Sequence, residues 1–173
     1  MAIDKRNIVL VGMPAAGKST MGVLLAKKMR YNFIDTDITI QVNHDATLEE
    51  LIAAQGNEAL LKMEAEVLES IEPARTVIAT GGSACYSAHA MEHLKTTGPI
   101  VYIYAAYEDV ARRVGDVKKR GVIMPKGYTF KDLFLERSAL YEQYADVTVD
   151  TTGISVARSV DLIADAVLEW LNS

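Results

Sequence analysis

The sequence of 173 residues has the length of one domain, and its 50% hydrophobic and 24% charged residues are typical of a globular protein. A net charge of -5 argues against bulk electrostatic attraction to nucleic acid or to an anionic membrane surface. The single cysteine, Cys85, cannot form an internal disulfide and fits a reducing, cytoplasmic setting. We therefore expect a cytoplasmic domain without nucleic-acid or membrane partners. Its oligomeric state is not readable from the sequence, and a monomer is compatible with it.

Short apolar runs alternate with longer segments of helical periodicity along the chain. Strands are predicted at 8–11, 32–35, 76–80, 100–104 and 147–149. Helices are predicted at 18–29, 47–56, 58–71, 107–114, 131–144 and 156–171, and another around 89–93. The apolar run 8–11 is too short for a signal sequence or a membrane span. This alternation predicts one domain over 1–173, with a parallel sheet covered by helices on both faces.

A phosphate-binding motif joins the first predicted strand to the first helix. Residues 12–20 read Gly-Met-Pro-Ala-Ala-Gly-Lys-Ser-Thr and match G-x-x-x-x-G-K-[ST]. Backbone N–H groups of such a loop converge on one anion at the start of a helix, where the helix dipole adds to them. Lys18 would contact the outer phosphates, and the Ser19 hydroxyl would be a ligand of Mg²⁺. The predicted nucleotide contacts are Gly12, Pro14, Ala15, Ala16, Gly17, Lys18, Ser19 and Thr20.

Two carboxylates, Asp35 and Asp37, follow the second predicted strand. The carboxyl ends of parallel strands line the crevice in which ligands bind, so both side chains could face the nucleotide. One could support the magnesium shell while the other orients or deprotonates an attacking hydroxyl. Acidic residues are also common in turns, so this interpretation depends on the phosphate loop upstream. The sequence has no N-K-x-D or T-K-x-D segment that would recognise guanine, and ATP is the expected nucleotide.

Taken together, these motifs resemble those of the shikimate kinase family. The resemblance covers nearly the whole chain and keeps the family's order and spacing. It rests on the phosphate loop, Phe33-Ile-Asp-Thr-Asp37, Gly56 eight residues before Glu64, Thr80-Gly-Gly82, Arg113 seven residues before Arg120, and Arg137-x-x-Leu-Tyr141. The resemblance implies a three-layer αβα P-loop kinase fold with a five-stranded parallel sheet, like that of nucleoside-monophosphate kinases.

The resemblance also implies roles on the nucleotide side. Asp35 would lie in the magnesium shell, and Asp37 would hold the acceptor hydroxyl as the candidate base. Arg120 would move in with a mobile lid at 116–128 and neutralise charge on the transferring phosphoryl group. Arg113 would lie near the adenine. Alternatively, Arg113 and Arg120 could belong to a solvated basic face.

The substrate side is implied in the same way. Helices within 38–72 would form the acceptor-binding segment. Gly81 and Gly82 would bring the backbone close to the substrate, as glycine permits. Arg137 would pair with a substrate carboxylate; the alternative is an ordinary surface residue on a helix.

Two positions depart from the family pattern. Leu61 stands where the family has an arginine, three residues before Glu64, and Ser83 stands where it has a third glycine. The neighbouring Lys62 lies about 100° further around the helix and is a poor substitute. A charge-assisted bond contributes roughly 1.5 to 3 kcal/mol, so losing one predicts about ten- to hundredfold weaker use of shikimate.

We therefore expect phosphoryl transfer to a different hydroxylated acid, one that keeps a carboxylate for Arg137. A hydroxy-amino acid such as homoserine fits this description, and shikimate itself is the main rival. The motifs are also compatible with a gluconate- or nucleotide-type kinase and with a non-catalytic ATP-binding regulator.

Overall fold

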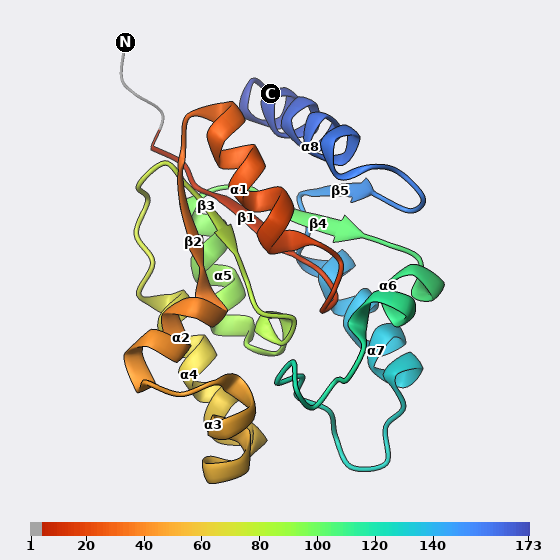
Figure 1. Ribbon diagram of the computed structural model, residues 1–173. Helices are drawn as coiled ribbons and strands as arrows, with labels where there is room; N and C mark the ends of the chain where they lie inside the picture. The colour runs from red at the N-terminus through yellow and green to blue at the C-terminus, as the bar shows by residue number, and fades with distance from the viewer. Residues whose placement is uncertain (1–4) are drawn as a thin grey trace.

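The computed structural model describes residues 5–173, which contain one five-stranded parallel sheet in the order β2-β3-β1-β4-β5 (Figure 1). Side chains of the central strand are fully buried, because helices cover both of its faces. The predicted strands are confirmed within one residue at each end. Their bounds are β1 Ile8–Val11, β2 Asn32–Asp35, β3 Thr76–Ala79, β4 Ile100–Tyr104 and β5 Val147–Asp150.

Helices cover the sheet on both faces, as the sequence predicted. Figure 1 shows α1 (Lys18–Met29) and α8 (Val156–Leu171) together on one face, where they share a hydrophobic cluster with the strands. The other face packs against α4 (Asn57–Glu69), α5 (Ala88–Thr97) and α7 (Phe130–Tyr144). A short helix α6 (Tyr107–Val114) follows β4, and a 3₁₀ turn, η1 (Ala84–Tyr86), follows β3. The architecture is therefore the expected three-layer αβα sandwich.

The helix α2 (Thr36–His44) is missing from the helices predicted by periodicity, although it lies largely within the helical segment near 38–72 that the family resemblance implied. Asp35 ends β2 and caps α2, because its Oδ1 accepts the backbone N–H groups of Asp37 and Ile38 at 3.0 and 3.3 Å. Asp37 therefore lies in the first helical turn. The helix was missed because β-branched Thr and Ile residues dominate its start and its apolar pattern is weak.

Three helices form a small group beside the end of the sheet at which β2 and β3 terminate. Helix α3 (Leu48–Gln55) begins at the predicted capping box, in which Thr47 and Glu50 exchange side chain to backbone hydrogen bonds. Helices α2, α3 and α4 share a separate cluster of apolar side chains: Ile40, Leu51, Leu60 and Ile123. Ile123 comes from the segment predicted as a lid, so this segment packs against the three helices.

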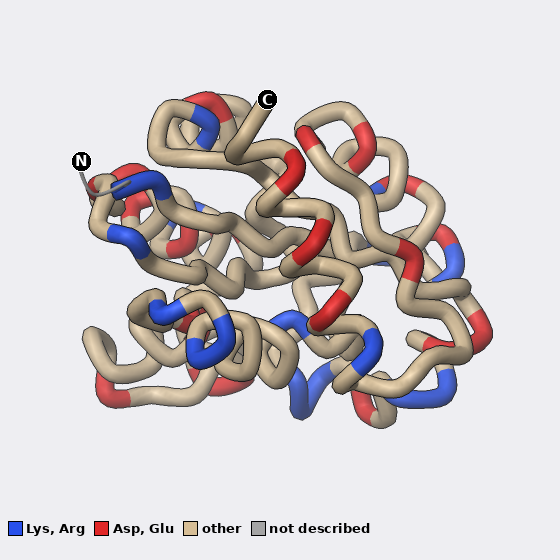
Figure 2. Tube along the Cα trace, turned by 90° about the horizontal axis from the view of Figure 1, so that it is seen from above, with Lys and Arg blue, Asp and Glu red and all other residues tan. Residues whose placement is uncertain are grey.

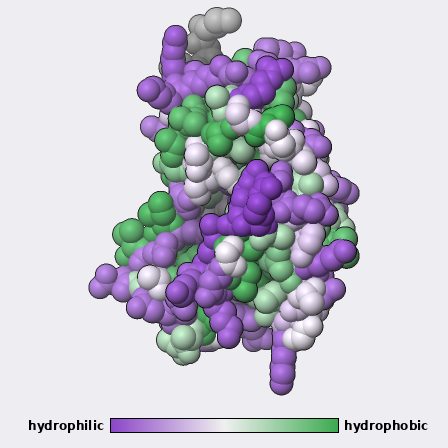
Figure 3. All heavy atoms as spheres, turned by 45° about the vertical axis from the view of Figure 1, so that its right-hand side comes forward, coloured by the Kyte–Doolittle hydropathy of each residue, from purple (hydrophilic) through white to green (hydrophobic). Residues whose placement is uncertain are grey.

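The charged residues of the described part are dispersed. Figure 2 shows Lys and Arg interspersed with Asp and Glu rather than gathered into one basic stripe. The space-filling view shows strongly hydrophilic side chains across the middle of one face (Figure 3). No helix within residues 5–173 has the length and apolar character that a membrane crossing requires.

Thr36 connects α2 to the end of β3, and its replacement by Val tests this connection. Its fully buried hydroxyl donates to the Ala79 carbonyl at 3.4 Å and accepts the Gly81 N–H at 3.2 Å. Because Thr36→Val leaves a buried N–H without a partner, we expect a loss of about 1 to 3 kcal/mol in the free energy of unfolding. Urea denaturation measures this loss. The exposed control Thr96→Val should change stability by less than about 0.5 kcal/mol, and an equal loss in both variants would contradict the connection.

Candidate active site

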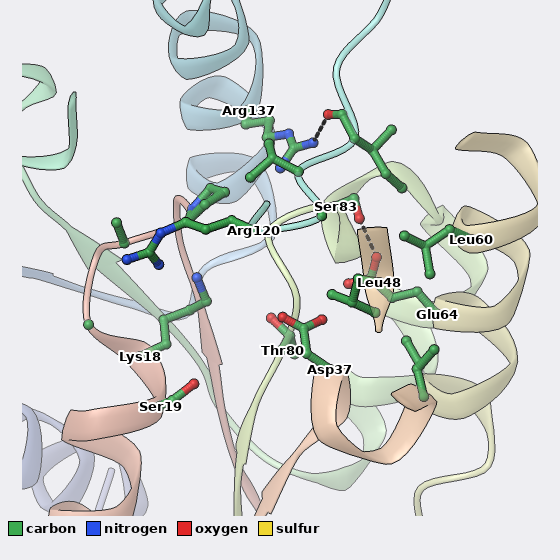
Figure 4. Close-up of a pocket in the computed structure, with 18 of the residues that line it drawn as sticks. Lys18, Ser19, Asp37, Leu48, Leu60, Glu64, Thr80, Ser83, Arg120 and Arg137 are labelled. Carbon is green, nitrogen blue, oxygen red and sulfur yellow. Dashed lines mark hydrogen bonds between the residues drawn. The ribbon is translucent and has the colours of Figure 1, made fainter. Parts of the chain in front are cut away.

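A cavity of about 380 Å³ opens where the carboxyl ends of β1 and β3 meet the helices. The phosphate loop lies on one side and the helices α2, α3 and α4 lie on the other (Figure 4). Residues 113–123 and α7 close the remaining side. Its charged and hydroxylated lining residues are Lys18, Ser19, Thr20, Asp37, Glu64, Thr80, Ser83, Arg113, Arg120 and Arg137.

The phosphate loop has the backbone geometry of an anion site. Gly12, Ala15 and Gly17 have positive φ angles of 153°, 65° and 97°, which turn the chain back on itself around the start of α1. Among residues 5–173 no side chain caps this helix, and its first turn carries no acidic residue. Its first N–H groups therefore suit an anionic ligand, as the sequence motif predicts.

Lys18 is oriented by the same loop. Its side chain is only 7% exposed, and Nζ donates to the carbonyls of Gly12 and Met13 at 2.6 and 2.8 Å. Burial lowers the pKa of Lys18 to about 8, although the charge of Asp37 opposes this shift. The ammonium group therefore remains mostly protonated at neutral pH and can contact phosphate.

Ser19 and Asp35 have the chemistry of a magnesium site. Ser19 Oγ donates to Asp35 Oδ2 at 2.5 Å beside the phosphate loop. Both offer oxygen atoms, and Mg²⁺ is typically bound by one or two protein oxygens together with phosphate and water. Within residues 5–173 no group of three or more His, Cys, Asp or Glu side chains is placed to hold a metal alone. The pair therefore fits a metal ion that arrives with a nucleotide.

Two carboxylates meet at Gly81, on the side of the cavity away from the phosphate loop. A Cβ atom at Gly81 would clash with Glu64 Oε1 and would lie 2.7 Å from Asp37 Oδ1. Burial and, to a smaller extent, the charge of Asp35 together raise the pKa of Asp37 to about 6. Burial also raises the pKa of Glu64 to about 7, with a contribution from Asp37. Glycine at position 81 therefore leaves room for both carboxylates to approach the same backbone position.

Arg137 is a buried cation that lines the same cavity. It is 1% exposed, which excludes the alternative of an ordinary surface residue. Its Nη2 donates to the Ile123 carbonyl at 2.7 Å, and its guanidinium carbon lies 5.2 Å from the centre of the Tyr86 ring. A Cβ atom at Gly82 would lie 2.8 Å from Arg137 Nη1. Gly82 therefore lets the guanidinium approach the backbone, as Gly81 does for the two carboxylates.

Arg113 and Arg120 are exposed and line the same cavity, and the roles expected for them stay predictions. Arg120 Nη2 donates to the Arg113 carbonyl at 3.3 Å, and Figure 4 shows the Arg120 side chain on the side of Lys18. Arg113 lies 3.6 Å from Asp109 in an ion pair on its own helix. Two guanidinium groups are thus available near the phosphate loop.

The structure corrects the prediction that Leu61 lines the acceptor site. Leu60 lines the main cavity, whereas Leu61 lines a smaller adjacent cavity of about 100 Å³ behind Glu64 and Ser83. The two leucines are consecutive on a helix, so their side chains point about 100° apart. Lys62 is exposed and lies 3.8 Å from Glu66, so it does not replace the missing arginine.

Glu64 is the functional candidate that the sequence interpretation missed. The sequence interpretation used Glu64 only to mark its spacing from Gly56. Glu64 lies four residues after Leu60, and hence on the same helix face, which could have identified it. In the structure it is 4% exposed, and Ser83 Oγ donates a short hydrogen bond to its Oε2. Ser83, the second departure from the family pattern, therefore partners this carboxylate.

Comparisons with known proteins agree with this geometry. The family model for shikimate kinase matches residues 14–171. Shikimate kinases of Francisella tularensis subsp. holarctica and of Francisella philomiragia are each 34% identical over 171 residues, covering 96% of this chain and 97% of the relative. The chain belongs to the shikimate kinase family. It is a small-molecule kinase that performs ATP-dependent phosphoryl transfer of the shikimate kinase type.

Solved structures of shikimate kinases share the fold. Shikimate kinase from Acinetobacter baumannii in complex with shikimate superimposes with a TM-score of 0.86 at 30% identity, over 95% of this chain and 93% of that one. Shikimate kinase from Aquifex aeolicus superimposes with a TM-score of 0.81 at 30% identity, over 94% of this chain and 96% of that one. A gluconokinase from Sinorhizobium meliloti, at 20% identity and a TM-score of 0.58, shares the fold alone. The predicted fold class is confirmed.

The buried charge of Glu64 predicts a pH-dependent cost to stability. Because the pKa of Glu64 is raised from 4.5 to about 7 in the folded state, the folded protein binds more protons, and stability falls as pH rises through this window. Replacing Glu64 with Gln removes the ionisation. At pH 8 we expect Glu64→Gln to raise the free energy of unfolding by about 2 to 3 kcal/mol.

Urea denaturation at pH 8 and at pH 5 measures this effect. The difference in the free energy of unfolding between Glu64→Gln and the unchanged protein should be much smaller at pH 5. At that pH most of the Glu64 carboxyls are protonated in the folded state. Glu66→Gln, on the exposed face of α4, is the matched control. It should leave the free energy of unfolding unchanged at both pH 8 and pH 5. A destabilised Glu64→Gln at pH 8 would contradict the prediction.

Proposed function

We propose that this kinase transfers the γ-phosphoryl group of MgATP to the hydroxyl of a small carboxylate-bearing acceptor other than shikimate. The observation that carries the proposal is the acceptor side of the cavity. There Arg137 is the buried cation beside Gly82, while the position of the family's second arginine is occupied by Leu61, which lies outside the main cavity.

The nucleotide half of the site supports this reaction. Gly12, Pro14, Ala15, Ala16, Gly17, Lys18, Ser19 and Thr20 would hold the phosphates through backbone N–H groups, the ammonium and the hydroxyls. Ser19 and Asp35 would hold Mg²⁺, which when bound offsets the negative charge of the phosphates. Arg113 would lie near the adenine.

The acceptor half of the site supplies the proton acceptor. With a pKa raised only to about 6, Asp37 is mostly ionised at neutral pH and can take the proton of the attacking hydroxyl. Lys18 and Arg120 would stabilise the charge that develops on the phosphoryl group as it moves between the two oxygens. Most of the rate enhancement would come from such positioning and charge neutralisation.

Residues 116–128 would act as a lid over the cavity. Ile123 is buried among Ile40, Leu51 and Leu60, and its carbonyl accepts from Arg137. At Gly121, with φ of 64°, a Cβ atom would clash with Leu48. Packing of this segment on α3 would exclude water from the phosphoryl group and limit ATP hydrolysis. Its mobility and the cytoplasmic location of the protein stay predictions.

The identity of the acceptor rests on Arg137, Leu61 and Ser83. Shikimate is the second candidate, because the relatives that match along the whole chain are shikimate kinases and the neighbour from Acinetobacter baumannii holds shikimate. With one arginine in place of two, the carboxylate of the acceptor would lose a charge-assisted bond. A smaller hydroxylated acid such as a hydroxy-amino acid fits the arrangement better.

Replacement of Lys18 or Asp37 tests the reaction. Lys18→Ala removes the ammonium that neutralises phosphate, and Asp37→Asn removes the proton acceptor while keeping the shape of the side chain. We expect kcat to fall by about 100-fold or more in each variant. A coupled assay for ADP release, with product detected by mass spectrometry, measures it. The exposed Asp45→Asn is the control, and near-normal turnover of Asp37→Asn would refute the assigned base.

Restoring the family pattern tests the acceptor. The double variant Leu61→Arg, Ser83→Gly returns the missing arginine beside Glu64 and removes the hydroxyl that now partners it. We expect its kcat/KM for shikimate to rise about ten- to hundredfold above that of the unchanged protein. Leu61→Met keeps the volume of the side chain and should not change kcat/KM for shikimate. Saturation of the unchanged protein by micromolar shikimate, with ordinary turnover, would show that shikimate is the acceptor.

A further inference from the structure

Glu64 carries a buried oxygen that the fold does not partner. Its Oε2 accepts from Ser83, but its Oε1 has no hydrogen-bond partner in the described part of the chain. Within residues 5–173 it is the only buried side-chain oxygen or nitrogen atom without a hydrogen-bond partner. Buried polar atoms in folded proteins are nearly always hydrogen-bonded, and leaving a charged one unpaired is costly. The orphaned oxygen therefore suggests a partner that arrives with a ligand.

The position of Glu64 restricts what this ligand can be. Its Oε1 and Asp37 Oδ1 both approach Gly81, and Arg137 Nη1 approaches the next residue, Gly82. Consecutive Cα atoms are about 3.8 Å apart, so an acceptor that contacts all three groups needs only a few carbon atoms. Figure 4 shows Asp37, Glu64, Ser83 and Arg137 around one space, with Leu48 and Leu60 beside it.

Once a nucleotide is bound, the acceptor side of the cavity has more negative than positive side chains. Lys18 and Arg120 lie where phosphate charge would occupy them, and Arg113 pairs with Asp109, which leaves Arg137 against the two carboxylates Asp37 and Glu64. An acceptor with a carboxylate and a hydroxyl would satisfy Arg137 and Asp37. It would leave Glu64 ionised without a partner, or force it to hold a proton.

We propose that Glu64 recognises an ammonium group on the acceptor, so that the substrate is a small hydroxy-amino acid held at three points. Its carboxylate lies at Arg137, its hydroxyl at Asp37 and its ammonium at Glu64 Oε1. Ser83 acts as a positioning residue, because its bond to Oε2 holds the carboxylate with Oε1 beside Gly81. The inference rests on the proposed function, since it identifies the acceptor of the same site.

The arrangement also explains the two departures from the family pattern together. An arginine at position 61 would lie beside Glu64 and would occupy its carboxylate in an ion pair. Leu61 removes that competitor, and Ser83 supplies a neutral hydroxyl that holds one oxygen without neutralising its charge. The negative charge of Glu64 then stays available for a cationic ligand. Removing either the charge or the hydroxyl should weaken recognition of the ammonium.

Matched pairs of acceptors test the inference. L-homoserine and 4-hydroxybutanoate share a carbon chain, a carboxylate and a terminal hydroxyl, and differ in the ammonium group; L-serine and 3-hydroxypropanoate form a second pair. With the unchanged protein and MgATP, we expect kcat/KM for the amino acid of at least one pair to exceed that of its partner by about ten- to hundredfold or more. Product formation is followed by mass spectrometry.

Variants of Glu64 test whether this residue causes the preference for the amino acid. Glu64→Gln should lower the ratio of kcat/KM for the amino acid to kcat/KM for the acid without the ammonium about ten- to hundredfold, mainly through a higher KM for the amino acid. Glu64→Asp keeps the charge and should retain part of the preference. Ser83→Ala should weaken it, and Glu66→Gln should leave it unchanged. Thermal unfolding checks that each variant folds.

The outcomes separate this inference from the proposed function. Equal use of the two members of each pair, a preference that survives Glu64→Gln, or no phosphorylation of any amino acid tested would overturn the inference. In those cases turnover of 4-hydroxybutanoate or another hydroxy acid would leave the proposed function standing. Turnover of shikimate alone would overturn both assignments of the acceptor. Absence of MgATP binding in calorimetry would refute the kinase site itself.

Discussion

The site depends on a group of buried charges at the carboxyl edge of the parallel sheet. Lys18, Glu64 and Arg137 are each less than a tenth exposed, and Asp37 lies among them. Charges withdrawn from water are tolerated only when opposite charges and hydrogen bonds surround them. Here four segments that are distant in sequence supply the groups: the phosphate loop, the first turn of α2, one face of α4 and the middle of α7. The fold must therefore bring these segments together accurately.

The sheet provides this accuracy. Strand β1 runs into the phosphate loop, β2 ends at the aspartate that caps α2, and β3 ends at the two glycines that the buried charges approach. Because the three strands are parallel neighbours, their carboxyl ends lie at one edge, and the loops that follow them meet. Gly81 and Gly82 leave room for the close approach of side chains, and neither has a positive φ angle. A methyl group at either position would displace a carboxylate or the guanidinium.

The pKa shifts show that this arrangement works against stability. Burial raises the pKa of both Asp37 and Glu64, so each is less favourable in its ionised form than it would be in water. A protein selected for stability alone would not place two carboxylates against one glycine. Such local costs are typical of functional sites, where they are offset by packing elsewhere and by the ligand. The extensive apolar clusters on both faces of the sheet supply that packing.

The sequence by itself determined the strands, most helices, the phosphate loop and the family, because each of these depends on local patterns. A continuous apolar run indicates a buried strand, and the spacing of glycine and lysine in 12–20 specifies an anion site wherever it follows such a strand. Helix α2 was missed because its β-branched, weakly patterned sequence carries little helical signal, and the Asp35 cap acts only where β2 ends.

Only the tertiary structure decided which of two consecutive leucines faces the cavity and that Arg137 is buried. It also decided that Glu64 has an oxygen beside Asp37 without a partner in the part of the chain described. These facts depend on how far α4 is rotated against the sheet and on which atoms of other segments surround each side chain. The spacing of residues along one chain restricts the rotation but does not fix it. Neighbours distant in sequence decide whether a charge is solvated, paired or left for a ligand.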